Sequence, residues 1–208
     1  MRIAISGTAN QGKSTFIKDF IKQWPQYSTP EVSYRELAKK NDIKINKQGD
    51  KKSQEIILNS LVDNALKYKK DDCVIHDRCV YDNLAYTLWL KSKEIGGLND
   101  EFIHKSIQIA KETAKFYDII FFTPILDQYP IEIVPDGLRD TDPVFRSEID
   151  YILKEIYGSY RSHTGGYFDF DDCPAVIELF GSREERIEMV KLYIDPSTGD
   201  VPTNSLLD

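Results

Sequence analysis

The feature that most constrains this chain is the segment at residues 7–14, which matches the pattern G-x-x-x-x-G-K-[ST] at every fixed position. A short apolar run from Ile3 to Ile5 precedes the segment, and Phe16, Phe20 and Ile21 follow it with helical spacing. The pattern therefore stands between a predicted strand and a predicted helix, as a phosphate-binding loop requires. A glycine-rich turn that does not bind phosphate would have no reason to lie between a strand and a helix in this way.

The residue types of this loop suit the phosphates of a nucleotide bound with magnesium. Glycines let backbone N–H groups close around phosphate oxygens, and the start of the next helix adds its positive end. Lys13 is expected to reach the β- and γ-phosphates of ATP, and the Ser14 hydroxyl is expected to ligate Mg²⁺. The predicted cofactor-binding residues are Gly7, Asn10, Gln11, Gly12, Lys13, Ser14 and Thr15.

Predicted strands and helices alternate along the chain. The strand candidates are residues 2–6, 27–32, 73–75, 118–122 and 175–180, of which the second is the least regular. The helix candidates are residues 13–23, 34–40, 53–68, 82–93, 100–116, 144–160 and 183–193. Central strands that are apolar throughout indicate a parallel sheet covered on both faces. We therefore expect a three-layer α/β fold with about five parallel strands and ligands beyond their carboxyl ends.

Two charged residues, Asp77 and Arg78, end the strand predicted at residues 73–75. At this position a carboxylate would point toward the phosphate site, where it can hold Mg²⁺ or accept a proton. Arg78 beside it would bind the acceptor. The alternative is that Asp77 and Arg78 only cap the next helix, which is an ordinary use of Asp after a strand.

A second carboxylate, Glu31, follows the less regular strand candidate at residues 27–32. From there it would face the γ-phosphate across the cleft and take the proton of the acceptor hydroxyl. Arg35 lies one helical turn further and is a candidate for substrate binding. A solvated carboxylate and a surface arginine remain the alternatives.

A long loop without sustained periodicity is predicted at about residues 126–148. It contains Arg139 and Arg146, which flank Asp140 and Asp142. Arginines on a closing loop can neutralise charge as a phosphoryl group moves, while closure excludes water. We therefore predict a lid in which Arg139 and Arg146 are catalytic, with a surface loop held by ion pairs as the alternative.

Several other residues are given structural roles. Residues 181–186 could surround an adenine ring, but Ser182 and Glu185 are better explained as a helix capping box. Tyr81, Tyr86 and Trp89 recur at helical spacing, which favours a place in the core over base stacking. We assign no catalytic histidine.

The composition limits the class of protein. The 208 residues are 41% hydrophobic, which is enough for the core of one domain, and a formal net charge of −7 does not favour nucleic acid as a partner. The three cysteines lack the spacing of a disulfide framework or a zinc site, and no segment reads as a signal peptide or membrane span. We expect one domain over residues 1–193, a polar tail over residues 194–208, a cytoplasmic location and no membrane partner. A homo-oligomer remains open.

Taken in order through residue 193, these motifs resemble those of small P-loop kinases. The chain resembles the AAA-domain proteins of bacteria and their phages that are related to the ribosylnicotinamide kinase domain of NadR. Deoxynucleoside and thymidylate kinases are more distant likenesses. The segments that carry the resemblance are residues 7–14, Pro30-Glu31, Asp77-Arg78, residues 136–140 and residues 181–186.

The resemblance implies a five-stranded parallel sheet, magnesium-ATP as donor and a hydroxyl or phosphate as acceptor. Asp77 and Arg78 look like the pair that nucleotide kinases use at the acceptor, and Glu31 looks like the general base of deoxynucleoside kinases. Arg139 and Arg146 look like the arginines of a lid.

Two positions depart from the pattern of these kinases. His76 stands where an apolar residue is usual, and Cys79 stands where nucleoside and thymidylate kinases have Ser or Tyr. The identity of the acceptor is therefore left open, as is the choice between Glu31 and Asp77 for the general base.

We expect a phosphotransferase that moves the γ-phosphate of ATP, with Mg²⁺, to a small nucleoside- or nucleotide-like acceptor. An ATP-hydrolysing switch of the AAA type is one alternative. A kinase that acts on a nucleotide within a polynucleotide is another, and it would use the lysines at positions 39, 40, 44, 47, 51 and 52. A solvated loop also explains those lysines.

Overall fold

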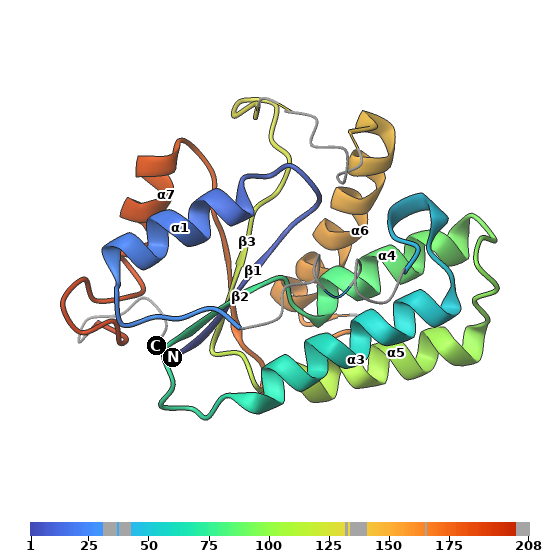
Figure 1. Ribbon diagram of the computed structural model, residues 1–208, viewed down its shortest axis with the longest axis horizontal. Coiled ribbons are helices and arrows are strands. Elements are labelled where there is room, and N and C mark those ends of the chain that lie inside the picture. Colours follow the sequence, from blue (N-terminus) through green and yellow to red (C-terminus); the bar gives the residue numbers. More distant parts are fainter. Residues whose placement is uncertain (31–36, 38–42, 132, 134–140, 165, 203–208) are drawn as a thin grey trace.

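A computed structural model describes residues 1–30, 37, 43–131, 133, 141–164 and 166–202 of the protein. Four parallel strands form its sheet in the order β2-β1-β3-β4 (Figure 1). They are β1 (Arg2–Ser6), β2 (Val74–Asp77), β3 (Ile119–Phe122) and β4 (Ala175–Glu178). Ala4 of β1 lies opposite His76 of β2 and Ile120 of β3. All four strands therefore end at one edge of the sheet, as predicted for a parallel α/β fold.

The fifth strand expected at residues 27–32 is a single bridge in the part that the structure describes. Ser28 lies beside β2, where its N–H donates to Cys73 O at 3.0 Å and its carbonyl accepts from Ile75 N at 2.9 Å. Pro30 has no N–H with which to continue the ladder. The described sheet consequently has four strands, with Ser28 beside its edge strand β2.

Helices cover both faces of the sheet, which confirms the three layers (Figure 1). One face carries α1 (Lys13–Gln23) and α7 (Arg183–Val190). The other carries α3 (Lys51–Lys67), α4 (Val80–Ser92), α5 (Asp100–Ala114) and α6 (Pro143–Ser162). Successive side chains of a strand point to opposite faces, so both sets of positions must be apolar. Every residue of β1 and β3 is buried.

Capping side chains determine where several helices begin. Asp50 accepts a hydrogen bond from Ser53 N at 2.8 Å, so α3 begins at Lys51 and a short 3₁₀ helix, Asn46–Gln48, precedes it. The helix expected from residue 53 therefore begins two residues earlier, at Lys51. Asp142 caps α6 in the same way, with Pro143 in the first turn. The loop predicted at residues 126–148 thus ends at Asp142.

The segment after α7 is attached to the domain. Trp24 Nε1 donates to Asp195 O at 2.9 Å, and the Tyr27 hydroxyl donates to Gly199 O at 2.7 Å. Ile194 is fully buried in the core beneath α1 and α7. The first part of the expected tail therefore packs against the end of α1. No helix in the described part of the chain is long and apolar enough to cross a membrane.

Candidate active site

The predicted phosphate-binding loop connects the end of β1 to the start of α1. Gly7 has a backbone φ of +146° and Gly12 a φ of +74°, conformations that favour glycine. A Cβ at Gly7 would lie only 2.4 Å from Thr123 Oγ1, beyond the end of β3. Phe16 N donates to Gly12 O at 2.8 Å, which begins α1 where the loop ends. The loop and the helix N-terminus therefore lie at the carboxyl edge of the sheet.

Lys13, the first residue of α1, is buried against this loop. Its Nζ donates to Gly7 O at 2.7 Å and to Thr8 O at 2.6 Å. Only 7% of the residue is exposed. The ammonium group therefore lies within the loop and not in solvent.

Ser14 and Asp77 come together because β1 and β2 are neighbours in the sheet. Ser14 Oγ donates to Asp77 Oδ2 at 3.5 Å. The two side chains fit Mg²⁺, which proteins hold with one or two oxygen ligands together with waters and substrate phosphates. Among the described residues, no cluster of three or more His, Cys, Asp or Glu side chains could hold a metal by itself. Asp77 does not cap the next helix, because Cys79 is the N-cap of α4.

Asp82 connects Arg78, the predicted acceptor-binding residue, to the phosphate-binding loop. Arg78 has a φ of +88°, which is rare for a residue other than glycine. Its Nη1 donates to Asp82 Oδ1 at 3.3 Å, and its guanidinium lies 5.5 Å from the centroid of the Tyr86 ring. Asp82 is fully buried and accepts further hydrogen bonds from Gly7 N at 3.1 Å and Cys79 N at 2.9 Å. The Asp82 carboxylate therefore contacts both Arg78 and the phosphate-binding loop.

A pocket of about 210 Å³ opens beside the Ser14–Asp77 pair, between α1 and α3. Its apolar wall includes Ile17, Ile57 and Leu61. The polar side chains that line it are Ser14, Lys18, Thr29, Ser60, Asn64, His76, Asp77 and Arg78. The pocket therefore combines an apolar wall with hydrogen-bonding groups at the predicted acceptor position.

His76 contributes a neutral ring to this pocket. It packs edge-on against Tyr68 and Tyr117, with ring centroids 5.5 Å away in each case. Burial lowers the pKa of His76 to about 4, and the nearby Arg2 contributes in the same direction. The imidazole is consequently uncharged at neutral pH, which explains how it occupies a position where an apolar residue is usual.

Two arginines from later helices contact the backbone of the phosphate-binding loop. Arg146 Nε donates to Ala9 O at 2.9 Å, and Arg186 Nη1 donates to Gln11 O at 2.9 Å. Arg146 was expected on the lid loop but lies in α6 with 6% exposure, because α6 begins at Pro143. Burial lowers the pKa of both guanidinium groups.

The described structure covers some of the predicted site residues and not others. The segment of residues 7–15 and the Asp77-Arg78 pair meet at one edge of the sheet. Glu31, Arg35 and Arg139 lie outside the described residues, so their predicted roles stay predictions.

Sequence reasoning missed Asp82, and it considered residues 181–186 without predicting that Arg186 contacts the loop. Asp82 follows Arg78 by four residues, which is the helical spacing of an interacting pair, so this signal was present. Arg186 carries no such signal, because its partner Gln11 is 175 residues away. The capping box of Ser182 and Glu185 is confirmed, with hydrogen bonds in both directions.

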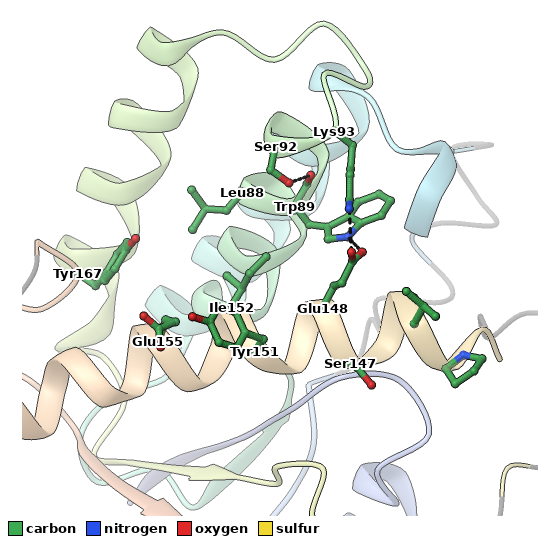
Figure 2. Close-up of a pocket in the computed structure, with 12 residues that line it drawn as sticks. Leu88, Trp89, Ser92, Lys93, Ser147, Glu148, Tyr151, Ile152, Glu155 and Tyr167 are labelled. Atoms are coloured by element: carbon green, nitrogen blue, oxygen red, sulfur yellow. Dashed lines mark hydrogen bonds and ion pairs between the residues drawn. The ribbon is translucent and has the colours of Figure 1, made fainter.

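A larger hollow of about 850 Å³ lies between α4 and α6, away from the phosphate-binding loop (Figure 2). Trp89 Nε1 and Lys93 Nζ both donate to the Glu148 carboxylate, at 2.7 Å and 2.8 Å. Tyr151 is 64% exposed along its wall. None of the phosphate-loop residues and neither Asp77 nor Arg78 lines it. We therefore place the candidate active site at the smaller pocket.

A family model described as an AAA domain matches residues 2–164, which is more than half of the chain. The chain belongs to this AAA-domain family. No curated protein matches the sequence.

Solved structures of kinases share the fold. A structure of NadR in complex with NR superposes with a TM-score of 0.65 at 16% identity, and it covers 92% of this chain and 50% of that one. The chain thus spans about half the length of the NadR protein. Thymidylate kinase from Candida albicans gives a TM-score of 0.61 at 14% identity, with 98% and 95% of the two chains covered.

Deoxyadenosine kinase from M. mycoides, with products dCMP and dCDP bound, gives a TM-score of 0.57 at 14% identity and covers 91% of this chain and 96% of that one. These matches establish the fold of P-loop kinases for this AAA-domain protein. They also confirm the resemblance to NadR and to deoxynucleoside and thymidylate kinases that the motifs indicate.

Proposed function

We propose that this AAA-domain protein is a phosphotransferase that moves the γ-phosphate of ATP to a small nucleoside- or nucleotide-like acceptor. The observation that carries the proposal is that Ser14, at the end of the proposed phosphate-binding loop, contacts Asp77 and that both residues line the 210 Å³ pocket. A donor held by the loop and an acceptor held in the pocket would then meet at one point.

The loop residues would bind the donor. Backbone N–H groups between Gly7 and Thr15 are suited to phosphate oxygens, supported by the N-terminus of α1. Lys13 would exchange its bonds to Gly7 O and Thr8 O for phosphate oxygens and stabilise the charge that develops during transfer. Asn10, Gln11, Gly12 and Ser14 complete the set of proposed ATP-binding residues.

Ser14 and Asp77 would hold Mg²⁺, which would supply positive charge to neutralise the phosphates of the nucleotide. The 3.5 Å separation of their oxygens supports this assignment. The proposed metal site is incomplete without the nucleotide, which is typical of Mg²⁺.

In the transfer step, the acceptor hydroxyl oxygen forms a bond to the γ-phosphorus while the bond between that phosphorus and the β–γ bridging oxygen breaks. ADP leaves with the bridging oxygen. The proton of the acceptor hydroxyl goes to a carboxylate, for which Asp77 and Glu31 are the candidates. Arg78 and Arg35 would orient the acceptor, and Arg139 would approach the moving phosphoryl group.

The test is ATP consumption with Mg²⁺ across nucleosides, deoxynucleoside monophosphates, nicotinamide riboside and single-stranded oligonucleotides, with mass detection of products. Phosphorylation of one small acceptor is the expected result. Hydrolysis without dependence on any acceptor would replace the proposal with an ATPase switch. A phosphorylated oligonucleotide would instead identify a polynucleotide kinase.

A further inference from the structure

Gln11 is the point where three separate parts of the chain meet the phosphate-binding loop. Its carbonyl accepts from Arg186 Nη1 of α7 at 2.9 Å. With its amide oriented to satisfy its neighbours, its side-chain oxygen accepts from Arg146 Nη2 at 2.9 Å and its nitrogen donates to Pro124 O at 3.3 Å. Gln11 is 4% exposed. Its side chain therefore faces the protein interior and not a ligand.

The two arginines act on the loop through carbonyl groups. Arg146 binds the carbonyl of Ala9, and Arg186 binds the carbonyl of Gln11. In a planar trans peptide the C=O and the following N–H point in opposite directions. Holding these two carbonyls toward α6 and α7 therefore aims the N–H groups of Asn10 and Gly12 away from those helices.

Arg186 is also a buried cation in an unusual environment. Only 7% of Arg186 is exposed, and its Nε is buried without a hydrogen-bond partner. Within the described part of the chain, its guanidinium forms no ion pair and donates to the carbonyl of Gln11. A buried charge without a counter-ion is unfavourable, so an anion nearby would stabilise it. The carbonyl of Gln11 alone supplies only a partial negative charge.

We propose that Gln11, Arg146 and Arg186 form a clamp that holds the loop in its phosphate-binding shape, with Arg186 of α7 as a positioning residue for ATP. The inference rests on the proposed ATP-binding function and deepens it. In the clamp, the side chain and carbonyl of Gln11 tie α6, α7 and the segment after β3 to the loop, so its part in ATP binding is left to its backbone N–H. Arg146 changes from a lid arginine to a member of the clamp.

The clamp is tested by calorimetric titration of ATP and Mg²⁺ into Arg186→Leu, Arg186→Lys and the matched control Arg183→Leu, without acceptor. Arg183 lies in the same helix but is exposed and pairs with Asp19 at the surface. We expect Arg186→Leu to raise the Kd for ATP at least about tenfold, Arg186→Lys to recover part of the affinity, and Arg183→Leu to match the wild type.

An unchanged Kd in Arg186→Leu, or a lower melting temperature with an unchanged Kd, would assign Arg186 to structure alone and overturn the clamp. If Arg186→Leu does not fold, the Kd of Arg186→Lys decides. In phosphoryl transfer, the KM for ATP should rise while the KM for the acceptor stays constant. ATP binding without transfer to any acceptor would overturn the proposed function and leave the clamp standing, whereas a wild type that binds no ATP would overturn both.

Discussion

Arg78 combines an unfavourable backbone conformation with a place in the wall of the 210 Å³ pocket. A φ of +88° costs about 1–3 kcal/mol in a residue with a side chain. The hydrogen bond to the buried Asp82 and the contact with the Tyr86 ring offset this strain. Strain that the surrounding structure maintains in this way is typical of residues held for ligand binding. The observation supports Arg78 as an acceptor-binding residue.

Lys13→Ala should lower kcat/KM for phosphoryl transfer at least about 100-fold, because it removes the cation proposed to stabilise the transferring group. Lys22→Ala, an exposed lysine in the same helix, is the matched control and should retain full activity. Steady-state kinetics with the acceptor found in the panel measure both, and melting curves check that each variant is folded. Retained activity in Lys13→Ala would contradict the assignment of the loop.

His76 should make stability depend on pH. Its pKa is about 4 in the folded protein and 6.5 when unperturbed, so below pH 6.5 the unfolded chain takes up a proton that the folded protein does not. Stability is therefore lost as the pH falls from about 6.5 toward 4. Between pH 7 and pH 5 we expect this group to lower the free energy of unfolding by roughly 2 kcal/mol.

The measurement for His76 is urea unfolding of the wild type and of His76→Phe at both pH values. Phenylalanine keeps the contacts with the rings of Tyr68 and Tyr117 but cannot titrate. The variant should lose roughly 2 kcal/mol less than the wild type between pH 7 and pH 5. The exposed His104, changed to Gln, should behave as the wild type does. Equal losses in wild type and His76→Phe would show that His76 does not control this pH range.

At the scale of elements, replacing glycine by alanine should have opposite effects on stability in the loop after β1 and inside the long helix α6. Gly7→Ala should destabilise by about 2 kcal/mol or more, because its Cβ would meet Thr123 Oγ1 at 2.4 Å and Thr123 O at 2.7 Å. Gly158 lies inside α6, and a Cβ there would meet nothing within 4 Å. Gly158→Ala should stabilise by roughly 1 kcal/mol, because alanine is the better helix former.

Thermal unfolding measures both glycine variants. We expect the melting temperature of Gly7→Ala to fall by at least roughly 4 °C and that of Gly158→Ala to rise by roughly 2–4 °C. If Gly7→Ala were as stable as the wild type, the close approach of the loop to Thr123 would be refuted.

At the scale of the whole molecule, the sheet separates two cores and brings the ends of the elements together. The described candidate site residues Ser14, Asp77 and Arg78 lie at the carboxyl edge of the strands, while the segment after α7 returns to the region around Trp24 and Tyr27. Burial raises the pKa of Tyr27, so its hydroxyl stays a neutral hydrogen-bond donor. The C-terminal segment therefore closes the core on the α1 side of the sheet.

Removal of residues 195–208 should lower the melting temperature relative to removal of residues 203–208 alone. The longer truncation removes Asp195 O and Gly199 O, which accept hydrogen bonds from Trp24 and Tyr27. Trp24 is 0% exposed and Tyr27 is 3% exposed. A buried donor left unpaired costs about 1–3 kcal/mol, so a fall of several degrees is expected. Differential scanning calorimetry compares the two truncations. Equal melting temperatures would mean that these two bonds contribute nothing to stability.

Local patterns were sufficient for much of the fold and for part of the site. The loop at residues 7–14 is contiguous in sequence, so its residue types alone predict its shape and its place between β1 and α1. The short apolar run at residues 73–75 predicted a strand there, so Asp77, which ends β2, could be placed at the carboxyl edge of the sheet. The strand predicted at residues 27–32 was harder to judge, because its short apolar pattern has little periodicity, and the described part of it makes a single bridge at Ser28.

The sequence by itself determined the parallel α/β architecture, the phosphate-binding loop and the position of Asp77 and Arg78 at a strand end. Only the tertiary structure decided that Arg146 and Arg186 both contact this loop, across 137 and 175 residues of chain. It also decided that Asp82 binds Gly7 N, across 75 residues. Periodicity states which face of a helix is buried but not which element covers it, and that choice follows from packing the whole chain.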